Sequence, residues 1–168
     1  MNWFFLTLGY SGLSPKAPGT IGTLVSLPLG ILILLYFDTN TLFLSAILIT
    51  MIAIKAINKH EKETNTHDDK RIVIDELAGM WIALSIAPAF GVPVDELFHL
   101  ENGFLIQSLL AFALFRYFDI AKPSIIGRID REVKGGLGVM GDDVIAGFAA
   151  GISTSILWQA YLYISASF

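Results

Sequence analysis

The chain has 168 residues, of which 54% are hydrophobic and 15% are charged, and it contains no cysteine. Soluble domains average roughly 25% charged residues, so this composition is typical of an integral membrane protein. The absence of cysteine excludes a thiol nucleophile and every thiolate metal site. A net charge of −4 argues against nucleic-acid binding, because such binding needs lysine and arginine to neutralise phosphates. The length predicts one domain over residues 1–168.

Five apolar segments predict an all-α, multi-pass membrane protein with about five helices. They cover residues 21–37, 42–57, 77–94, 103–118 and 144–168. A helical span needs about 20 residues, with about 17 as the minimum. The first segment is therefore marginal, and shorter, partly buried helices are an alternative for the second and fourth. Pro88 and Pro93 predict that the third segment is kinked or ends early, and residues 3–8 are too short to span.

Charged residues divide unequally between the two ends of these segments. If all five cross, the N-terminus, residues 58–76 and residues 119–143 share one side, which holds all 11 lysines and arginines. The opposite loops carry only acids, namely Asp38, Asp95, Glu96 and Glu101. The positive-inside rule therefore places the basic side in the cytoplasm.

Five acids lie where the apolar segments meet the basic side: Asp75, Glu76, Asp119, Asp142 and Asp143. Two carboxylates about 5 Å apart repel by roughly 3 kcal/mol at an effective dielectric of about 20, so a convergent cluster needs protons, basic partners or a metal. Carboxylate oxygens favour Mg²⁺, Mn²⁺ or Ca²⁺. The alternatives are capping of helix N-termini by the two acidic pairs and an ion pair of Asp119 with Arg116.

Basic residues alternate with these acids at Arg116, Lys122, Arg128, Arg131 and Lys134. One interpretation is an anion site, in which these side chains and the backbone N–H groups of Gly135, Gly136 and Gly138 bind phosphate. The other is a basic belt that contacts anionic lipid head groups, with the glycines forming turns. Arg116 and Lys122 favour the anion site because they bracket an acid at a helix end.

Two further stretches offer polar side chains. His67 and Asp68 precede the first acidic pair, where a histidine is a candidate proton shuttle or metal ligand, or else a solvated loop residue. His60 has no such neighbours and is given no role. The opening loop is rich in proline, glycine and threonine, and irregular backbone near a membrane is tolerated where it lines a cavity. The loop is therefore a candidate wall of the site or a simple helix-entry turn; its polar side chains are Ser11, Ser14, Thr20 and Thr23.

Five motifs occur in a characteristic order: SGLSPKAPGTIGTL at 11–24, HDDKRIVIDELAGMW at 67–81, FRYFDIAKP at 115–123, IDREVKGGLGVM at 129–140 and GDDVIAG at 141–147. With these motifs the chain resembles the phosphatidylglycerophosphatase A family of bacterial lipid phosphatases. Any one motif is short, but five in the same order are specific, and together they span most of the chain.

The resemblance implies an all-helical, Mg²⁺-dependent phosphomonoesterase that converts phosphatidylglycerophosphate to phosphatidylglycerol and phosphate. Its partners would be this phospholipid and the bilayer, and its site would face the cytoplasm at the bacterial inner membrane. The candidate metal ligands are Glu76, Asp119, Asp142 and Asp143; the candidate substrate-binding residues are Thr20, Arg116, Lys122 and Arg131; the candidate catalytic residues are His67, Asp68 and Asp75. Direct attack by water and an aspartyl-phosphate intermediate both stay open.

Three other classes are alternatives to this interpretation. One of them, a non-enzymatic membrane scaffold, leaves the convergence of the acids unexplained. Another enzyme of phospholipid head groups is disfavoured because the D-G-x-x-A-R signature of CDP-alcohol phosphotransferases and the P-S-G-H motif of acid-phosphatase-like enzymes are both absent. A metal-ion transporter would carry carboxylates near the middle of its spans, whereas these acids lie at segment ends.

Overall fold

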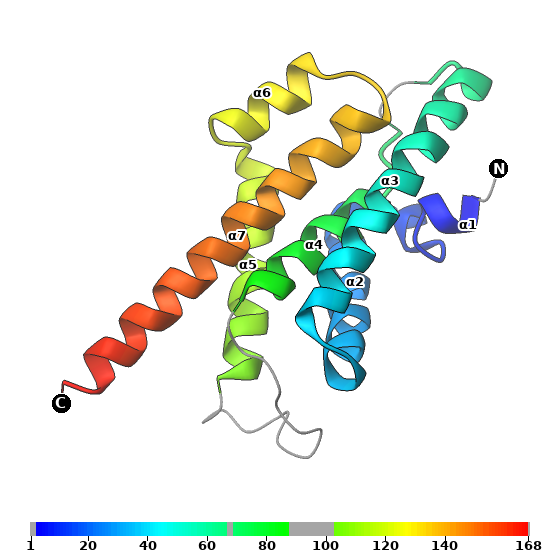
Figure 1. The fold of residues 1–168 in the computed structure, drawn as a ribbon. Helices are drawn as coiled ribbons and strands as arrows, with labels where there is room; N and C mark the ends of the chain where they lie inside the picture. Colours follow the sequence, from blue (N-terminus) through cyan, green and yellow to red (C-terminus); the bar gives the residue numbers. More distant parts are fainter. Residues whose placement is uncertain (1–2, 67–68, 88–102, 168) are drawn as a thin grey trace.

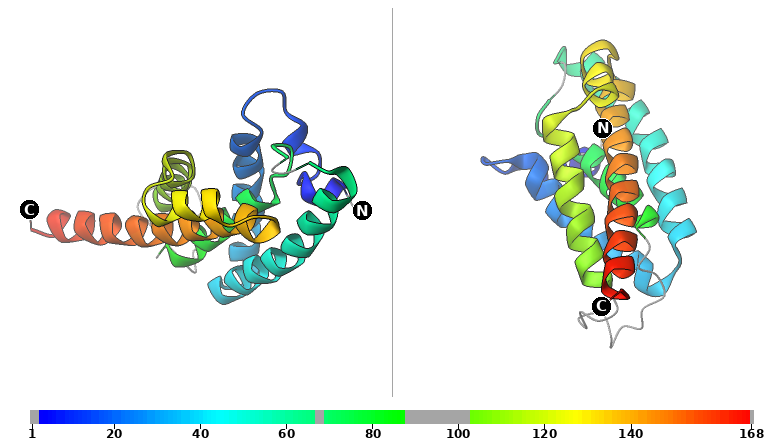
Figure 2. Two further views of the ribbon diagram at one scale, coloured as in Figure 1. Left: turned by 90° about the horizontal axis from the view of Figure 1, so that it is seen from above. Right: turned by 90° about the vertical axis from the view of Figure 1, so that its left-hand side faces the viewer.

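The computed structural model describes residues 3–66, 69–87 and 103–167, which are helical and contain no strand (Figure 1). The elements are α1 (Trp3–Leu6), the 3-10 turn η1 (Ser11–Leu13), α2 (Pro18–Tyr36), α3 (Thr39–Thr64), α4 (Ile74–Ile86), α5 (Phe104–Ala121), α6 (Ile125–Glu132) and α7 (Gly136–Ser165). The all-α prediction is confirmed. In Figure 2, α7 runs the length of the molecule, and α6 is folded back over its first turns.

Four helices, α2, α3, α5 and α7, are long and apolar enough to cross a membrane. Less than a third of the apolar window of each is buried within the protein, so most of its surface faces outward. That surface includes exposed leucines and isoleucines, such as Leu44 and Leu48 on α3 and Ile156 on α7. The proposed alternative of short helices for the second and fourth segments is wrong, because α3 has 26 residues and α5 has 18.

The third segment forms the short central helix α4, which has 13 residues. Every residue from Leu77 to Leu84 is buried, because α4 packs against α2, α3, α5 and α7. A helix that is apolar on all sides is typical of a protein interior. It ends at Ile86, and Ala87 is extended with ψ 135°, because the residue before a proline avoids the helical region. Pro88 thus gives the predicted early end, while Pro93 lies outside the described residues.

The backbones of α4 and α7 touch at two glycines. A Cβ on Gly147 would overlap the carbonyl oxygen of Gly79, and a Cβ on Gly79 would lie 2.6 Å from the carbonyl oxygen of Asp143. Small residues permit this close approach of apolar helices. The contact holds the acidic first turn of α4 beside the acidic second turn of α7.

We expect Gly147→Ala to lower the stability of the protein by about 1–3 kcal/mol, because the new methyl group must push α4 away from α7. Gly141→Ala on the same helix is the control, since among the described residues its Cβ would meet only Ile129 Cγ2, at 3.2 Å. Both changes gain similar helix propensity, so the difference between their Tm values in detergent measures the clash. A Gly147→Ala protein that is as stable as Gly141→Ala would contradict the close contact.

A small cluster holds the segment that leads into α4. The Trp3 ring stacks on His60 with centroids 5.0 Å apart, and the Arg71 guanidinium lies 5.0 Å from the same ring. Arg71 binds the Asp69 carboxylate, and this hydrogen bonding is the main cause that lowers the pKa of Asp69 to about 2. His60, for which the sequence analysis predicted no role, is buried with Nε2 3.6 Å from Asp69 Oδ2. The cluster joins α1, α3 and the turn before α4.

Candidate active site

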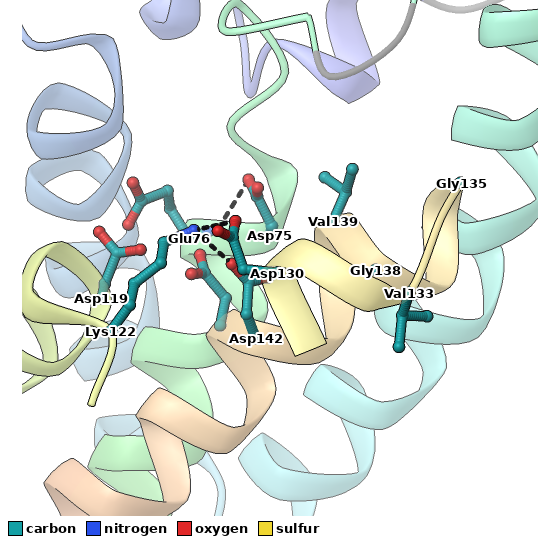
Figure 3. Close-up of a pocket in the computed structure, with 11 residues that line it drawn as sticks. Asp75, Glu76, Asp119, Lys122, Asp130, Val133, Gly135, Gly138, Val139 and Asp142 are labelled. Atoms are coloured by element: carbon teal, nitrogen blue, oxygen red, sulfur yellow. Dashed lines mark hydrogen bonds and ion pairs between the residues drawn. The ribbon is translucent and has the colours of Figure 1, made fainter. Parts of the chain in front are cut away.

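All five predicted acids line one pocket, where α4 and α7 begin and α5 ends (Figure 3). The pocket has a volume of about 290 Å³ and is also lined by Lys122, Asp130 and the glycines at the start of α7. Convergence follows from the topology, because α4 and α7 start at this end and α5 finishes at it. The structure thus brings together the acids that the sequence placed at three separate segment ends.

The first turn of α4 supplies Asp75 and Glu76. Asp75 Oδ1 accepts the backbone N–H of Glu76 at 3.0 Å, so this acid also stabilises the helix N-terminus, as the capping alternative predicted. Burial, followed by the charge of Glu76, raises the pKa of Asp75 well above its usual range. Burial, followed by the charge of Asp119, raises the pKa of Glu76. Both shifts show that the pocket disfavours accumulated negative charge.

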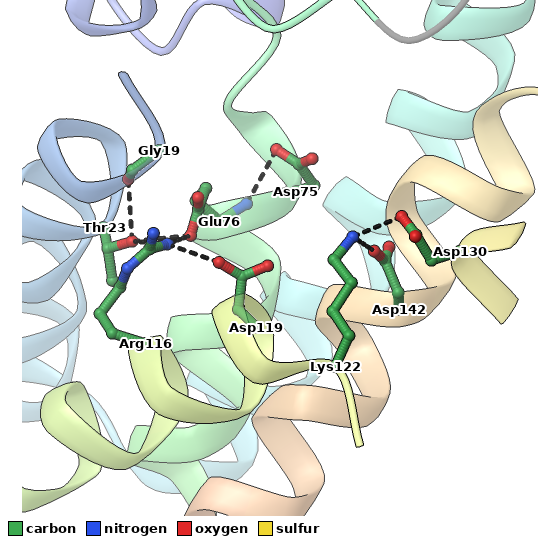
Figure 4. Close-up of polar contacts among 9 residues, drawn as sticks. All are labelled: Gly19, Thr23, Asp75, Glu76, Arg116, Asp119, Lys122, Asp130 and Asp142. Atoms are coloured by element: carbon green, nitrogen blue, oxygen red, sulfur yellow. Dashed lines mark hydrogen bonds and ion pairs between the residues drawn. The ribbon is translucent and has the colours of Figure 1, made fainter. Parts of the chain in front are cut away.

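Arg116 on α5 offsets part of that charge (Figure 4). Its Nη1 lies 2.5 Å from Glu76 Oε2 and 2.9 Å from Asp119 Oδ2, and it donates a 3.2 Å hydrogen bond to Thr23 Oγ1. Thr23 in turn donates to Glu76 Oε2 at 2.7 Å. The predicted alternative of an ion pair between Arg116 and Asp119 is therefore present, and the same arginine also holds Glu76.

Lys122 is the centre of a second group of ion pairs at the pocket. Its Nζ lies 2.7 Å from Asp142 Oδ2 and also binds Asp130 on α6. Burial alone would lower the pKa of Lys122, but its hydrogen bonds to Asp130 and Asp142 more than offset this and raise it. Lys122 ends α5 in the left-handed region, with φ 42°, which directs the chain back into α6.

Asp142 and Asp143 lie inside α7, because this helix begins at Gly136 and not near Val144. Capping therefore does not explain these two acids. Their exposed fractions are 5% and 3%, and isolated buried carboxylates are costly. Asp142 Oδ1 is buried and, within the described part of the chain, has no hydrogen-bond partner, which marks it as an oxygen available to a ligand.

The described side chains of the site are of the kind that bind a hard metal ion, but their present positions do not form a metal site. Among the described residues, no group of three or more acidic or histidine side chains is arranged to hold a metal ion. Arg116 and Lys122 instead bind Glu76, Asp119 and Asp142. The donor set is nevertheless carboxylate oxygen, which suits a hard cation, and Asp142 Oδ1 is the buried oxygen that lacks a partner. Metal binding would therefore require some of these carboxylates to move away from their basic partners.

The structure places the remaining predicted residues outside the pocket or outside its description. Thr20 is half-buried in the first turn of α2, and Arg131 is exposed on α6, with its guanidinium beside Gly127. Neither is among the described residues that line the pocket. His67 and Asp68, the predicted proton carriers, lie outside the described residues.

The predicted glycines serve two purposes. Gly135 has φ 72°, a conformation that favours glycine, and it lines the pocket with Gly138. Gly136 and Gly138 allow close packing, because a Cβ on either would overlap the backbone carbonyl of Ile54 or Val133. The N–H of Gly136 donates to Asn58 Oδ1 at 2.7 Å.

The sequence did not predict Asp130 as a site residue, and it did not distinguish Thr23 from the other polar residues of the opening loop. Asp130 reaches Lys122 only because α6 folds back over α7, which no local pattern predicts. Thr23 was one of several polar loop candidates. Pro18 is the signal that could have favoured Thr23. Proline is frequent at the first helical position, and a helix that begins at Pro18 places residues 19 and 23 on one face.

Fold and site together define a helical membrane protein with a small acidic pocket, whose acids bind Lys122 and Arg116, at one end of its apolar helices. The sequence profile named "Phosphatidylglycerophosphatase A" matches residues 4–158. The chain belongs to this family and is a phosphoric monoester hydrolase, as its motifs predicted.

Three relatives from bacteria are similar over most of their length. Phosphatidylglycerophosphatase A of Escherichia coli is 36% identical over 93% of this chain and 81% of its own, and that of Haemophilus influenzae is 33% identical over 86% and 82%. A Bacteroides thetaiotaomicron protein, provisionally named a phosphatidylinositol-3-phosphatase, is 41% identical over 82% of this chain and 80% of its own. No solved structure matches the chain significantly.

Proposed function

We propose that this enzyme hydrolyses the terminal phosphomonoester of phosphatidylglycerophosphate. In the net reaction the bond between phosphorus and the glycerol oxygen is broken by water: phosphorus gains the hydroxyl group and the glycerol oxygen gains the proton, which leaves phosphatidylglycerol and inorganic phosphate. The observation that carries the proposal is the pocket itself, where six acids and Lys122 of the family motifs meet and Arg116 binds two of those acids. The printed names of the Escherichia coli and Haemophilus influenzae relatives support the choice of lipid.

The size of the pocket supports entry of the phosphorylated head group alone. Its volume of about 290 Å³ is at the small end of ligand pockets, which run from about 300 to 1,000 Å³. The acyl chains would then stay in the bilayer against the exposed apolar faces of the long helices. We place this end of the molecule at the cytoplasmic face, because the lysines and arginines gather on that side of the apolar segments.

The proposed cofactor is Mg²⁺, with Glu76, Asp119, Asp142 and Asp143 as its ligands and Asp75 beside them. When bound, the ion supplies Lewis-acid polarisation of a phosphoryl oxygen and a water of lowered pKa. Arg116 and Lys122 would then also neutralise charge on the substrate. Phosphoryl transfer depends on positioning and charge neutralisation. Lys122 would therefore turn from Asp130 and Asp142 to the phosphate oxygens, and Arg116 would offset the substrate's charge from its place beside Glu76 and Asp119. His67 and Asp68 remain the proposed proton carriers, and the segment Asp69–Val73 joins them to α4.

The test is phosphate release by the purified protein in detergent, with Mg²⁺ and then with excess EDTA. We expect release from phosphatidylglycerophosphate that stops in EDTA and returns with Mg²⁺. Phosphatidylinositol 3-phosphate is the competing substrate, because the 41% identical relative is provisionally named for it. If kcat/KM is higher for phosphatidylinositol 3-phosphate than for phosphatidylglycerophosphate, the proposed substrate is wrong. Full activity in EDTA would sink the metal proposal while keeping the lipid.

A further inference from the structure

Thr23 lies at the junction of three helices beside the acidic pocket. It sits on α2, is fully buried, and contacts Glu76 of α4 and Arg116 of α5. The proposed function uses both of those residues but gives Thr23 no role. From its contacts we infer that Thr23 is a positioning residue, which holds the Glu76 carboxylate and the Arg116 guanidinium in their working orientation. This inference rests on the proposed phosphatase function.

The Thr23 hydroxyl both donates and accepts hydrogen bonds. A hydroxyl has one proton and two lone pairs. The proton is directed to Glu76 Oε2 at 2.7 Å and to the carbonyl oxygen of Gly19 at 2.9 Å, and the oxygen accepts Arg116 Nη1 at 3.2 Å. Arg116 Nη1 and Thr23 Oγ1 therefore meet at the same oxygen of Glu76. That oxygen is bound on two sides, and its direction is fixed.

The other oxygen of Glu76, Oε1, lies beside Gly19, where only a glycine leaves it space. A Cβ on Gly19 would overlap Glu76 Oε1 and lie 3.5 Å from Arg116 Nη1. Gly19 and Thr23 lie one turn apart on α2, so they share the face that meets α4. One face of α2 thus touches both carboxylate oxygens: the glycine gives Oε1 room, and the threonine holds Oε2.

If Thr23 served only helix packing, we would expect its hydroxyl to bond within its own helix or to have no partner. Ser26 is also buried on α2, but within the described residues its hydroxyl bonds only to the carbonyl oxygen of Gly22 in the same helix, which is a common local bond. Thr154 on α7 is fully buried, and its Oγ1 has no partner in the described chain. Thr23 differs from both, because its side chain bonds to two charged residues from two other helices.

The experiment compares Thr23→Val, Thr23→Ser and the control Thr154→Val in the full-length protein. Valine keeps the shape of threonine and removes the hydroxyl, whereas serine keeps the hydroxyl. Hydrogen bonds to charged groups are the strong ones, so we expect Thr23→Val to lower kcat by roughly 10- to 100-fold with KM changed by less than about threefold. Thr23→Ser should return kcat to within about threefold of wild type, and Thr154→Val should leave it unchanged.

The outcomes separate this inference from the proposed function. No phosphate release by the folded wild type would overturn the function itself. Wild-type activity retained by folded Thr23→Val, or lost equally in Thr23→Ser, would overturn the positioning role. If Thr23→Val does not fold, Thr23→Ala replaces it, because alanine and serine differ by one oxygen and both are smaller than threonine. Equal kcat in that pair would also overturn the inference.

Discussion

Asp142→Asn is expected to lower phosphate release by roughly 10²- to 10³-fold while the protein stays folded. This is the range for removing one preorganised charged or polar group from an active site. Asparagine keeps the shape of aspartate, and its amide oxygen can still accept the hydrogen bond that Lys122 donates to Oδ2 at 2.7 Å. The position of Oδ1, which is buried without a partner in the described chain, would then carry an NH₂ group that cannot bind a cation.

The control for this substitution is Asp38→Asn. Asp38 precedes α3 and accepts the backbone N–H of Thr41 at 2.7 Å, and it does not line the pocket. Asparagine caps helices as well as aspartate does, so activity and Tm should be preserved. The readouts are kcat and the affinity for Mn²⁺ measured without substrate. Asp142→Asn with unchanged Mn²⁺ affinity would remove Asp142 from the ligand set, and unchanged kcat would remove it from the site.

The sequence predicted the fold best where one local signal decides the structure. Pro88 predicted the end of α4 because a proline restricts the residue before it. The start of α7 was predicted too late, because glycines and two acids interrupt the apolar pattern before Val144. Those residues are helical for tertiary reasons: Gly136 packs on the backbone of Ile54, and Asp142 pairs with Lys122.

The same distinction applies to the site. Convergence of the acids was predictable, because they lie at the ends of helices that share one side. The choice of Thr23 over Thr20 was not, because it depends on how α2 is rotated against α4. Asp130 needed the fold-back of α6, which places it beside Lys122. The motifs therefore identified the acids at the segment ends, whereas only helix packing identified Thr23 and Asp130.

Arg116→Met is expected to lower both activity and stability, because it removes the cation from the buried Glu76 and the half-buried Asp119. The Arg116 side chain is 13% exposed, and its Nη1 bonds to Glu76 and Asp119. Removing one partner of a buried ion pair costs about 3–5 kcal/mol, and we expect the lower end here because the pocket opens to water. Loss of an oxyanion-binding group would reduce kcat by roughly 10²- to 10³-fold.

Mg²⁺ distinguishes a charge effect from a packing effect in this variant. If the site binds the ion, Mg²⁺ should raise the Tm of Arg116→Met by more than it raises that of wild type, because only the variant lacks the arginine charge between Glu76 and Asp119. Arg128→Met, at an exposed position on α6 outside the pocket, should match wild type in Tm and kcat. A Tm loss in Arg116→Met that Mg²⁺ does not reduce would assign the arginine to packing, since its stem, and not its charge, would then be what the fold requires.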